Sequence, residues 1–178
     1  MRYVFAFIFF LIINNSFSQS RESKFVNDYI KYLSEDNEEL KNDTYHFQLK
    51  YKITKERFDY KKNDEVNKLN TWLYTLGSQK TIKYGDLDIS WNRNEISWNQ
   101  KFRRIRKFQK DEIGCTHINY FKITKPIFYK DYALFICRFG TNFGHQSSTY
   151  CLYEWNEKTG EIIELKNNLF SISSPCFR

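Results

Sequence analysis

The chain has 178 residues, with 28 Lys or Arg against 21 Asp or Glu, and its formal net charge is +7. It contains 17 Phe, 13 Tyr and 4 Trp but only 2 Pro and 6 Gly, which excludes disordered and collagen-like chains and is enough for a substantial core. The positive balance favours anionic partners, although a lysine-rich solvated surface gives the same excess.

The first eighteen residues have the pattern of an export signal. Arg2 precedes an unbroken apolar run over 4–13, and small residues follow at Ser16 and Ser18. The run is shorter than the about 20 residues that a membrane-spanning helix needs, and no other run is apolar enough to span. We therefore expect residues 1–18 to be removed near Ser18/Gln19, which leaves a secreted or periplasmic domain at 19–178. An N-terminal membrane anchor is the alternative.

Two amphipathic helices are predicted in the first half of that domain. Apolar residues recur at helical spacing over 20–33 and again over 64–76. Gly77 follows the second helix and can end it, because glycine readily adopts the left-handed conformation found after helices.

One strand and one hairpin are predicted around the second helix. Apolar and polar residues alternate over 45–53, which is typical of a strand with one side in water, and His46 lies on the polar side. A solvent-exposed or hydrogen-bonded role suits His46 better than metal binding, since no partner ligand is visible. A short hairpin is expected over 81–91, with its turn at Gly85-Asp86.

The motif Ile-Ser-Trp-Asn occurs twice, at 89–92 and at 96–99. The two copies could be the legs of a small hairpin. However, Ser97 and Gln100 have the spacing of a helix capping box, and we predict a helix over 97–110. Its aromatic side chains would share one side, and its cations would cover the remainder.

This basic segment is the strongest functional candidate in the sequence. Cations provide contacts to phosphate or other acidic groups, and neighbouring aromatic rings provide stacking. The predicted ligand-binding residues in it are Lys101, Arg103, Arg104, Arg106 and Lys107. The structural alternative is an amphipathic helix whose aromatic side packs on a sheet and whose basic side is solvated. Nucleic acid ranks below envelope anions as a ligand, because export is expected.

The chain is organised around a strand pair in its C-terminal third. Strands over 132–139 and 148–155 flank a loop, and centring that loop on Gly144 puts Cys137 opposite Cys151. One side of the pair would carry Ala133, Phe135, Cys137 and Phe139 against Thr149, Cys151, Tyr153 and Trp155. The other side is apolar too, so the pair is expected to be covered on both sides, and the pattern fixes the register only weakly.

Turn signals on either side of this pair extend it to a meander over about 122–165. Gly160 fits a turn with a positive φ before a third strand. Pro126 cannot donate a ladder hydrogen bond, which places it at an edge, a bulge or a strand start. Lys130 and Asp131 are expected to form a tight turn.

The segments KPIFYKDYALF at 125–135 and LYEWNEKTG at 152–160, with a glycine-containing loop between them, resemble the C-terminal module of a known family. Its members are small secreted proteins of unknown function from Gram-negative bacteria. The resemblance covers about the last third of the chain and implies no activity, cofactor or catalytic residue. That family often has C-G-x-x-C-G in the loop, whereas this chain reads FGTNFG at 139–144, which argues against thiol chemistry there.

Four cysteines lie in the predicted mature chain, at 115, 137, 151 and 176. An exported chain meets oxidising conditions, so an even number suggests up to two disulfides. The register above favours Cys137–Cys151 and leaves Cys115–Cys176, although four cysteines allow three pairings and some could remain buried thiols. No two of them have a zinc-type C-x-x-C spacing.

The loop over 140–148 is a second candidate binding site. Phe143 and His145 offer an aromatic ring and a polar donor between rigid strands, with Arg138 at the base of the loop. The alternative is a mobile hairpin tip. We find no catalytic, metal-binding or cofactor-binding motif, although carboxylate pairs that meet only in space stay open.

Together these patterns predict an α+β domain with an antiparallel sheet of five to seven strands and two or three helices packed on one face. The function that they favour is a non-enzymatic interaction module for a protein or an anionic glycan or lipid. A periplasmic immunity-type inhibitor of a toxin and a small secreted hydrolase are the alternatives. An exposed patch complementary to an enzyme cleft would indicate the former, and a pocket with converging His, Cys or carboxylate groups the latter.

Overall fold

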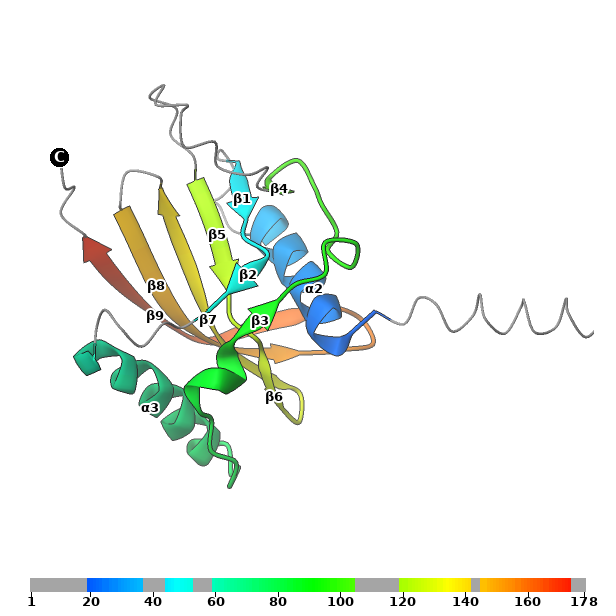
Figure 1. Ribbon diagram of the computed structural model, residues 1–178. Coiled ribbons are helices and arrows are strands. Elements are labelled where there is room, and N and C mark those ends of the chain that lie inside the picture. Colours follow the sequence, from blue (N-terminus) through cyan, green and yellow to red (C-terminus); the bar gives the residue numbers. More distant parts are fainter. Residues whose placement is uncertain (1–18, 37–43, 53–58, 105–118, 142–144, 174–178) are drawn as a thin grey trace, which may run out of the picture.

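The computed structural model describes residues 19–36, 44–52, 59–104, 119–141 and 145–173, with the side chains of 59–65, 104, 145–146 and 166–173 outside this description (Figure 1). The expected export signal lies outside it too. The elements are α2 (Arg21–Asp36), β1 (Tyr45–Phe47), β2 (Lys50–Tyr51), α3 (Asp59–Thr75), the 3-10 turn η2 (Tyr84–Leu87), β3 (Ile89–Ser90), β4 (Phe102–Arg104), β5 (Asn119–Ile123), β6 (Ile127–Tyr129), β7 (Tyr132–Thr141), β8 (His145–Trp155) and β9 (Ile162–Ser173).

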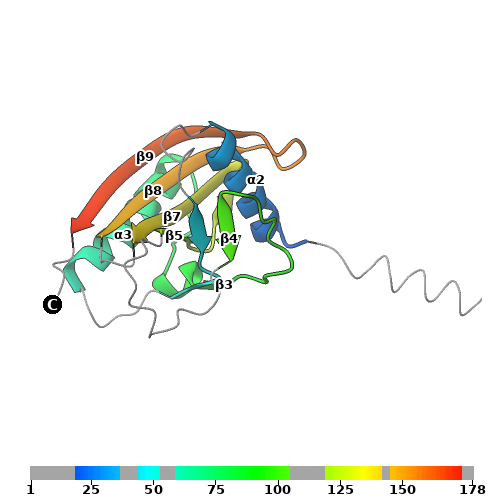
Figure 2. The same ribbon diagram turned by 90° about the horizontal axis from the view of Figure 1, so that it is seen from above.

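Seven strands form the main sheet, in the order β4-β1-β5-β7-β8-β9, with β6 also paired to β7. Figure 2 shows this sheet as a curved layer. Its pairs are antiparallel except for those of β1, which runs parallel to both β4 and β5. β2 and β3 form a separate antiparallel pair. The predicted α+β class is confirmed, and the predicted antiparallel sheet is mixed at this edge.

The two described helices cover opposite faces of the sheet, whereas the sequence predicted helices on one face. β7 alternates its side chains between two cores: Phe135 and Cys137 pack with α2, and Leu134 and Ile136 pack with α3. The physical reason is that both faces of β7 and β8 are apolar, so each face needs its own cover.

Helix α2 begins where its sequence provides a cap. The Ser23 N–H donates to the Ser20 hydroxyl at 3.2 Å, which satisfies one of the unpaired donors of the first turn. The predicted helix over 20–33 is confirmed and continues to Asp36. Its apolar residues Phe25, Val26, Tyr29, Ile30 and Leu33 are all buried.

Helix α3 ends as predicted and begins earlier than predicted. Gly77 has a φ of 86°, and the Ser78 N–H donates to the Leu73 carbonyl at 3.0 Å, which closes the C-terminal turn. The helix starts at Asp59, five residues before the predicted start at 64. Leu69, Trp72 and Leu73 face the second core.

The predicted strands over 132–139 and 148–155 are confirmed, and so is their distribution of side chains between faces. The register is wrong by two residues. Cys137 pairs with Thr149, and Phe135 pairs with Cys151. A shift of two keeps every side chain on its own face, so the apolar pattern could not distinguish the two registers.

The predicted strand over 45–53 divides into two elements. β1 belongs to the main sheet, whereas β2 leaves it to pair with β3. Between them the Gln48 N–H donates to Phe121, and the Leu49 carbonyl accepts from Trp91, at 2.8 and 2.7 Å. Gln48 is therefore the last residue of this segment that bonds to β5, and from Leu49 onward the segment bonds to β3 and the residue after it.

The hairpin predicted over 81–91 is absent. The side-chain oxygen of Asn70 accepts the Ile82 N–H at 2.7 Å, and its amide group donates to the Ile82 carbonyl at 3.1 Å. A side chain of helix α3 therefore pairs with the N–H and carbonyl groups of Ile82, which a partner strand would otherwise have paired. Asp86 accepts the Lys83 N–H and closes the turn η2 instead.

The helix predicted from residue 97 is also wrong over its described part. Asn99 accepts the N–H groups of Lys101 and Phe102 at 2.9 and 2.8 Å, which forms a side-chain turn that competes with a helix. β4 follows, and its Phe102 is fully buried in the core on the α2 side. Residues 105–110 lie outside the description.

The turn residues of the C-terminal meander are where the sequence predicted them. Pro126 lies in the break between β5 and β6, where the Thr124 hydroxyl accepts the Ile136 N–H at 3.0 Å. Lys130 has a φ of 53° in the turn before β7, and Gly160 a φ of 75° before β9. No helix within the described ranges is long and apolar enough to cross a membrane.

Candidate anion-binding site

The structure places the predicted ligand-binding residues in three ways. Arg103 and Arg138 lie on strands of the main sheet, β4 and β7, and their side chains are described. Lys101 immediately precedes β4. The backbones of Arg104 and His145 lie in β4 and β8, but their side chains are outside the description. Arg106, Lys107 and Phe143 lie outside the described residues altogether.

Strand pairing brings Arg103 level with two residues from distant parts of the sequence. His46 on β1 pairs with Arg103 on one side and with Tyr120 of β5 on the other. The neighbouring positions Phe47 and Phe102 are buried on the α2 side. Because side chains alternate along a strand, His46, Arg103 and Tyr120 share the opposite face of the sheet.

Two cations lie directly opposite each other on that same face. Lys122 of β5 pairs with Arg138 of β7. The Lys122 ammonium lies 5.0 Å from the centre of the Tyr120 ring, and the Arg138 guanidinium lies 5.4 Å from the centre of the Tyr51 ring. Each cation therefore rests against an aromatic ring, which favours positive charge at its face. We call His46, Arg103, Lys122 and Arg138 the cationic face.

The surroundings of Lys122 disfavour its positive charge. Partial burial, and secondly the neighbouring Arg138 guanidinium, lower the pKa of the Lys122 ammonium. Arg21–Glu157 and Lys125–Glu22 are ion pairs between described residues, and Lys122 forms none with a described carboxylate. A bound anion would give the Lys122 ammonium a negatively charged partner.

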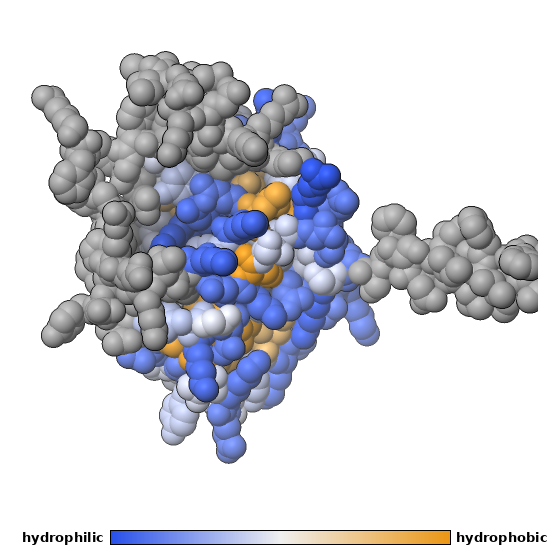
Figure 3. Space-filling view, viewed as in Figure 1, coloured by the Kyte–Doolittle hydropathy of each residue, from blue (hydrophilic) through white to orange (hydrophobic). Residues whose placement is uncertain are grey.

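The surroundings of this cation pair are polar and aromatic. Tyr51 and Tyr120 are almost fully buried, and Ser148 of β8, next to Arg138 in the ladder, is 2% exposed. Lys122 and Arg138 are half-buried, whereas Arg103 is exposed. The described surface in Figure 3 is mainly hydrophilic, with small hydrophobic areas between the polar side chains.

Sequence reasoning identified Arg103 and Arg138 separately and missed Lys122 and His46 as partners. The alternation of Lys122 with the apolar residues Phe121 and Ile123 is the local signal for a lysine on the less apolar face of a strand. His46 lies on the polar side of the alternating pattern over 45–53. No local signal predicts that β1 lies parallel between β4 and β5, and that pairing is what gathers the four residues.

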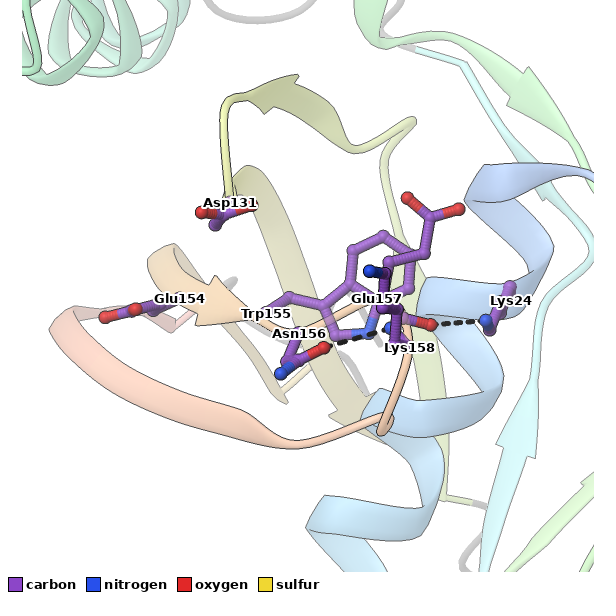
Figure 4. Close-up of a pocket in the computed structure, with 7 residues that line it drawn as sticks. All are labelled: Lys24, Asp131, Glu154, Trp155, Asn156, Glu157 and Lys158. Atoms are coloured by element: carbon purple, nitrogen blue, oxygen red, sulfur yellow. Dashed lines mark hydrogen bonds between the residues drawn. The ribbon is translucent and has the colours of Figure 1, made fainter.

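A separate hollow of about 690 Å³ lies beside the turn between β8 and β9 (Figure 4). Two of its lining residues join the turn to α2, because Lys24 donates to the Glu157 carbonyl. Arg21 of α2, outside the hollow, forms a 2.9 Å ion pair with the Glu157 carboxylate. In Figure 4, Asp131 and Glu154 lie on the other side of Trp155 from Lys24. The polar side chains drawn in Figure 4, which are the described lining of the hollow, therefore do not converge on one point.

The two described cysteines, Cys137 and Cys151, are free thiols, and the predicted disulfide between them is not formed. Both are buried beneath α2. Burial, followed by a hydrogen bond with the Cys151 thiol, raises the pKa of the Cys137 thiol well above its ordinary value, which disfavours a reactive thiolate. Cys115 and Cys176 lie outside the described residues.

A scan against family models and searches among curated proteins and solved structures found no match for this chain. In the described residues, no group of three or more His, Cys, Asp or Glu side chains could hold a metal ion.

Proposed function

We propose that this protein is an exported interaction module that binds an anionic component of the cell envelope through the cationic face. One observation carries the proposal: two half-buried cations, Lys122 and Arg138, lie opposite each other, and no described carboxylate forms an ion pair with Lys122. Like charges at opposing positions of a sheet destabilise it, and an anion between them offsets that cost.

The residue types suit an oxyanion. Arginine presents a planar set of donors that can bind two oxygens at once, and lysine adds a compact charge. Tyr51 and Tyr120 shield the pair from water on their own sides. In such partly dry surroundings an ion pair is stronger than at an open surface.

Retention on heparin-agarose, a resin that carries a sulfated glycan, tests this proposal. The double variant K122Q/R138Q should elute at clearly lower salt than the natural protein, because two charged contacts are lost. In solution, removing them should weaken heparin binding at least about tenfold, which corresponds to ~1.4 kcal/mol.

The matched control is K80Q/K158Q, which removes the same charge from two exposed lysines outside the cationic face. It should elute close to the natural protein. Equal shifts for the two double variants would mean that only net charge matters, and the proposal would fail. Circular dichroism and melting temperature should show that both variants fold.

A further inference from the structure

The cationic face is elongated across the strands, since its residues come from four neighbouring strands, β4, β1, β5 and β7. Arg103 lies level with Tyr120, two residues along β5 from Lys122. With strands about 4.8 Å apart and a rise of about 3.3 Å per residue, the backbone positions of Arg103 and Lys122 are about 12 Å apart. An anion held midway between Lys122 and Arg138 is about 14 Å from the backbone of Arg103 on the same spacings, which is farther than the Arg103 side chain extends.

The depth of the cations restricts the shape of the ligand. Lys122 and Arg138 are half-buried, and the side chains of Tyr51 and Tyr120 beside them are almost fully buried. A broad acidic protein surface would be held away from cations at this depth. A thin chain can place one anionic group between them and continue across the sheet.

We propose that the ligand is a chain-like polyanion that crosses the strands, with one oxyanion between Lys122 and Arg138 and another at Arg103. This inference rests on the proposed function and specifies its ligand. His46 lies between the two positions, beside Arg103 and Tyr120, and contacts the connecting part of the chain. Sulfated glycans and polyphosphate share this chemistry of repeated oxyanions.

Calorimetric titration with three probes tests the inference: orthophosphate, long-chain polyphosphate and a sulfated oligosaccharide of similar length. The decisive variant is R103Q, and R93Q is its control, because Arg93 is an exposed arginine in the turn before Ile96. R103Q should weaken binding of at least one polymeric probe about fivefold and leave orthophosphate binding unchanged. R93Q should change neither.

The possible outcomes distinguish failure of the extended-ligand inference from failure of the proposed anion-binding function. If K122Q weakens binding of a polymeric probe and R103Q does not, the extended ligand is refuted and the anion site stands. If K122Q has no effect on any probe, both fail. The polymer whose affinity depends on Arg103 identifies the source, and dependence on Arg103 for neither polymer overturns the inference.

Discussion

Lys122 illustrates how a single side chain can serve binding at the expense of stability. Its ammonium is half-buried, faces the Arg138 guanidinium across the ladder and forms no ion pair with a described carboxylate. A charge in this position costs folding free energy in the absence of a ligand. Binding sites often contain such residues, because groups arranged for a ligand are not arranged for the free protein.

The first prediction is that K122Q is slightly more stable than the natural protein at neutral pH, by at most about 0.5 kcal/mol because solvent screens the pair. The pKa of Lys122 is lowered in the folded state, so the unfolded chain binds the proton more tightly and stability rises with pH. The advantage of K122Q should therefore shrink as pH rises toward 10.5, the ordinary value for lysine.

Urea unfolding of both proteins at pH 7 and at pH 10 measures this difference. Comparing the two proteins at each pH cancels the titration of all other groups. A K122Q protein that is clearly less stable at pH 7 would show that Lys122 is satisfied within the fold, and it would remove the main support for an anion site.

Glu95 has the opposite character, because its charge favours the folded state. Its carboxylate accepts the Ser20 hydroxyl and the Asn92 amide, both at 3.0 Å, beside the N-terminus of α2. Hydrogen bonds, chiefly from Ser23 and then from Ser20, lower the pKa of this carboxyl. The partial positive charge of a helix N-terminus adds to that preference.

We expect E95Q to lose about 0.5 kcal/mol of stability at pH 7, since Glu95 is partly exposed and solvent screens its charge. The contribution of Glu95 is present above its ordinary pKa of 4.5 and is lost as pH falls through the lower, folded-state value. The natural protein and E95Q should therefore converge in acid. Thermal melts from pH 7 to pH 3 measure this, with E161Q as the exposed control. A constant difference across that range would contradict the assignment.

At the scale of elements, the end of β8 and the turn before β9 are held against α2 by polar contacts. Trp155 donates its indole N–H to the Asp28 carboxylate at 2.9 Å. Gly160 follows in the turn with a φ of 75°, and a Cβ added there would lie 3.0 Å from an Asp28 oxygen. A side chain at Gly160 would therefore meet both an unfavourable backbone conformation and a steric clash.

G160A should destabilise the protein by about 1–2 kcal/mol, because an L-residue is strained at this φ and Asp28 must move. Gly85 is the matched control: it has no positive φ, and an added Cβ meets no atom within 4 Å. G85A should be close to neutral. Chemical denaturation of both variants measures the contrast, and equal losses would refute this role of the turn.

Thiol accessibility tests the register of β7 and β8. Cys137 pairs with Thr149, two residues before Cys151, so the two cysteines occupy diagonal positions of the ladder. Residues at diagonal positions are about 7–8 Å apart, which is too far for an unstrained disulfide. Both thiols should resist alkylation in the native protein and react in urea without a reductant. Mass spectrometry of alkylated peptides measures this. Unlabelled Cys137 and Cys151 peptides that stay joined to each other in urea would indicate the disulfide and the register that the sequence predicted.

Sequence could predict the elements with strong local signals and could not predict their partners. The helix over 20–33, the end of α3 at Gly77 and the meander turns follow from periodicity and turn residues. Both faces of β7 are apolar, so nothing in the pattern indicated which face each helix would cover. Arg103 and Arg138 were predicted from separate segments, and only the pairing of β1 with distant strands brings them onto one face.

Across the whole molecule, the net charge of +7 is only a background for binding. Exposed lysines attract anions over a range that salt limits to about 10 Å at ordinary ionic strength. The half-buried pair of Lys122 and Arg138 is screened less, so its contribution should persist when salt suppresses general attraction. This difference is why the heparin experiment compares variants of equal charge.

The parallel pairing of β1 has a consequence for how the protein folds. Tyr45 pairs with Phe102 and Asn119, which are far away along the chain, whereas β7, β8 and β9 follow one another closely in the sequence. Closing long loops is slow, so the C-terminal meander should form first and β1 should insert late. Late elements are commonly those that open first in the native state. Amide hydrogen exchange should therefore be faster in β1 than in β7 and β8, and adding a polyanion should slow it selectively in β1.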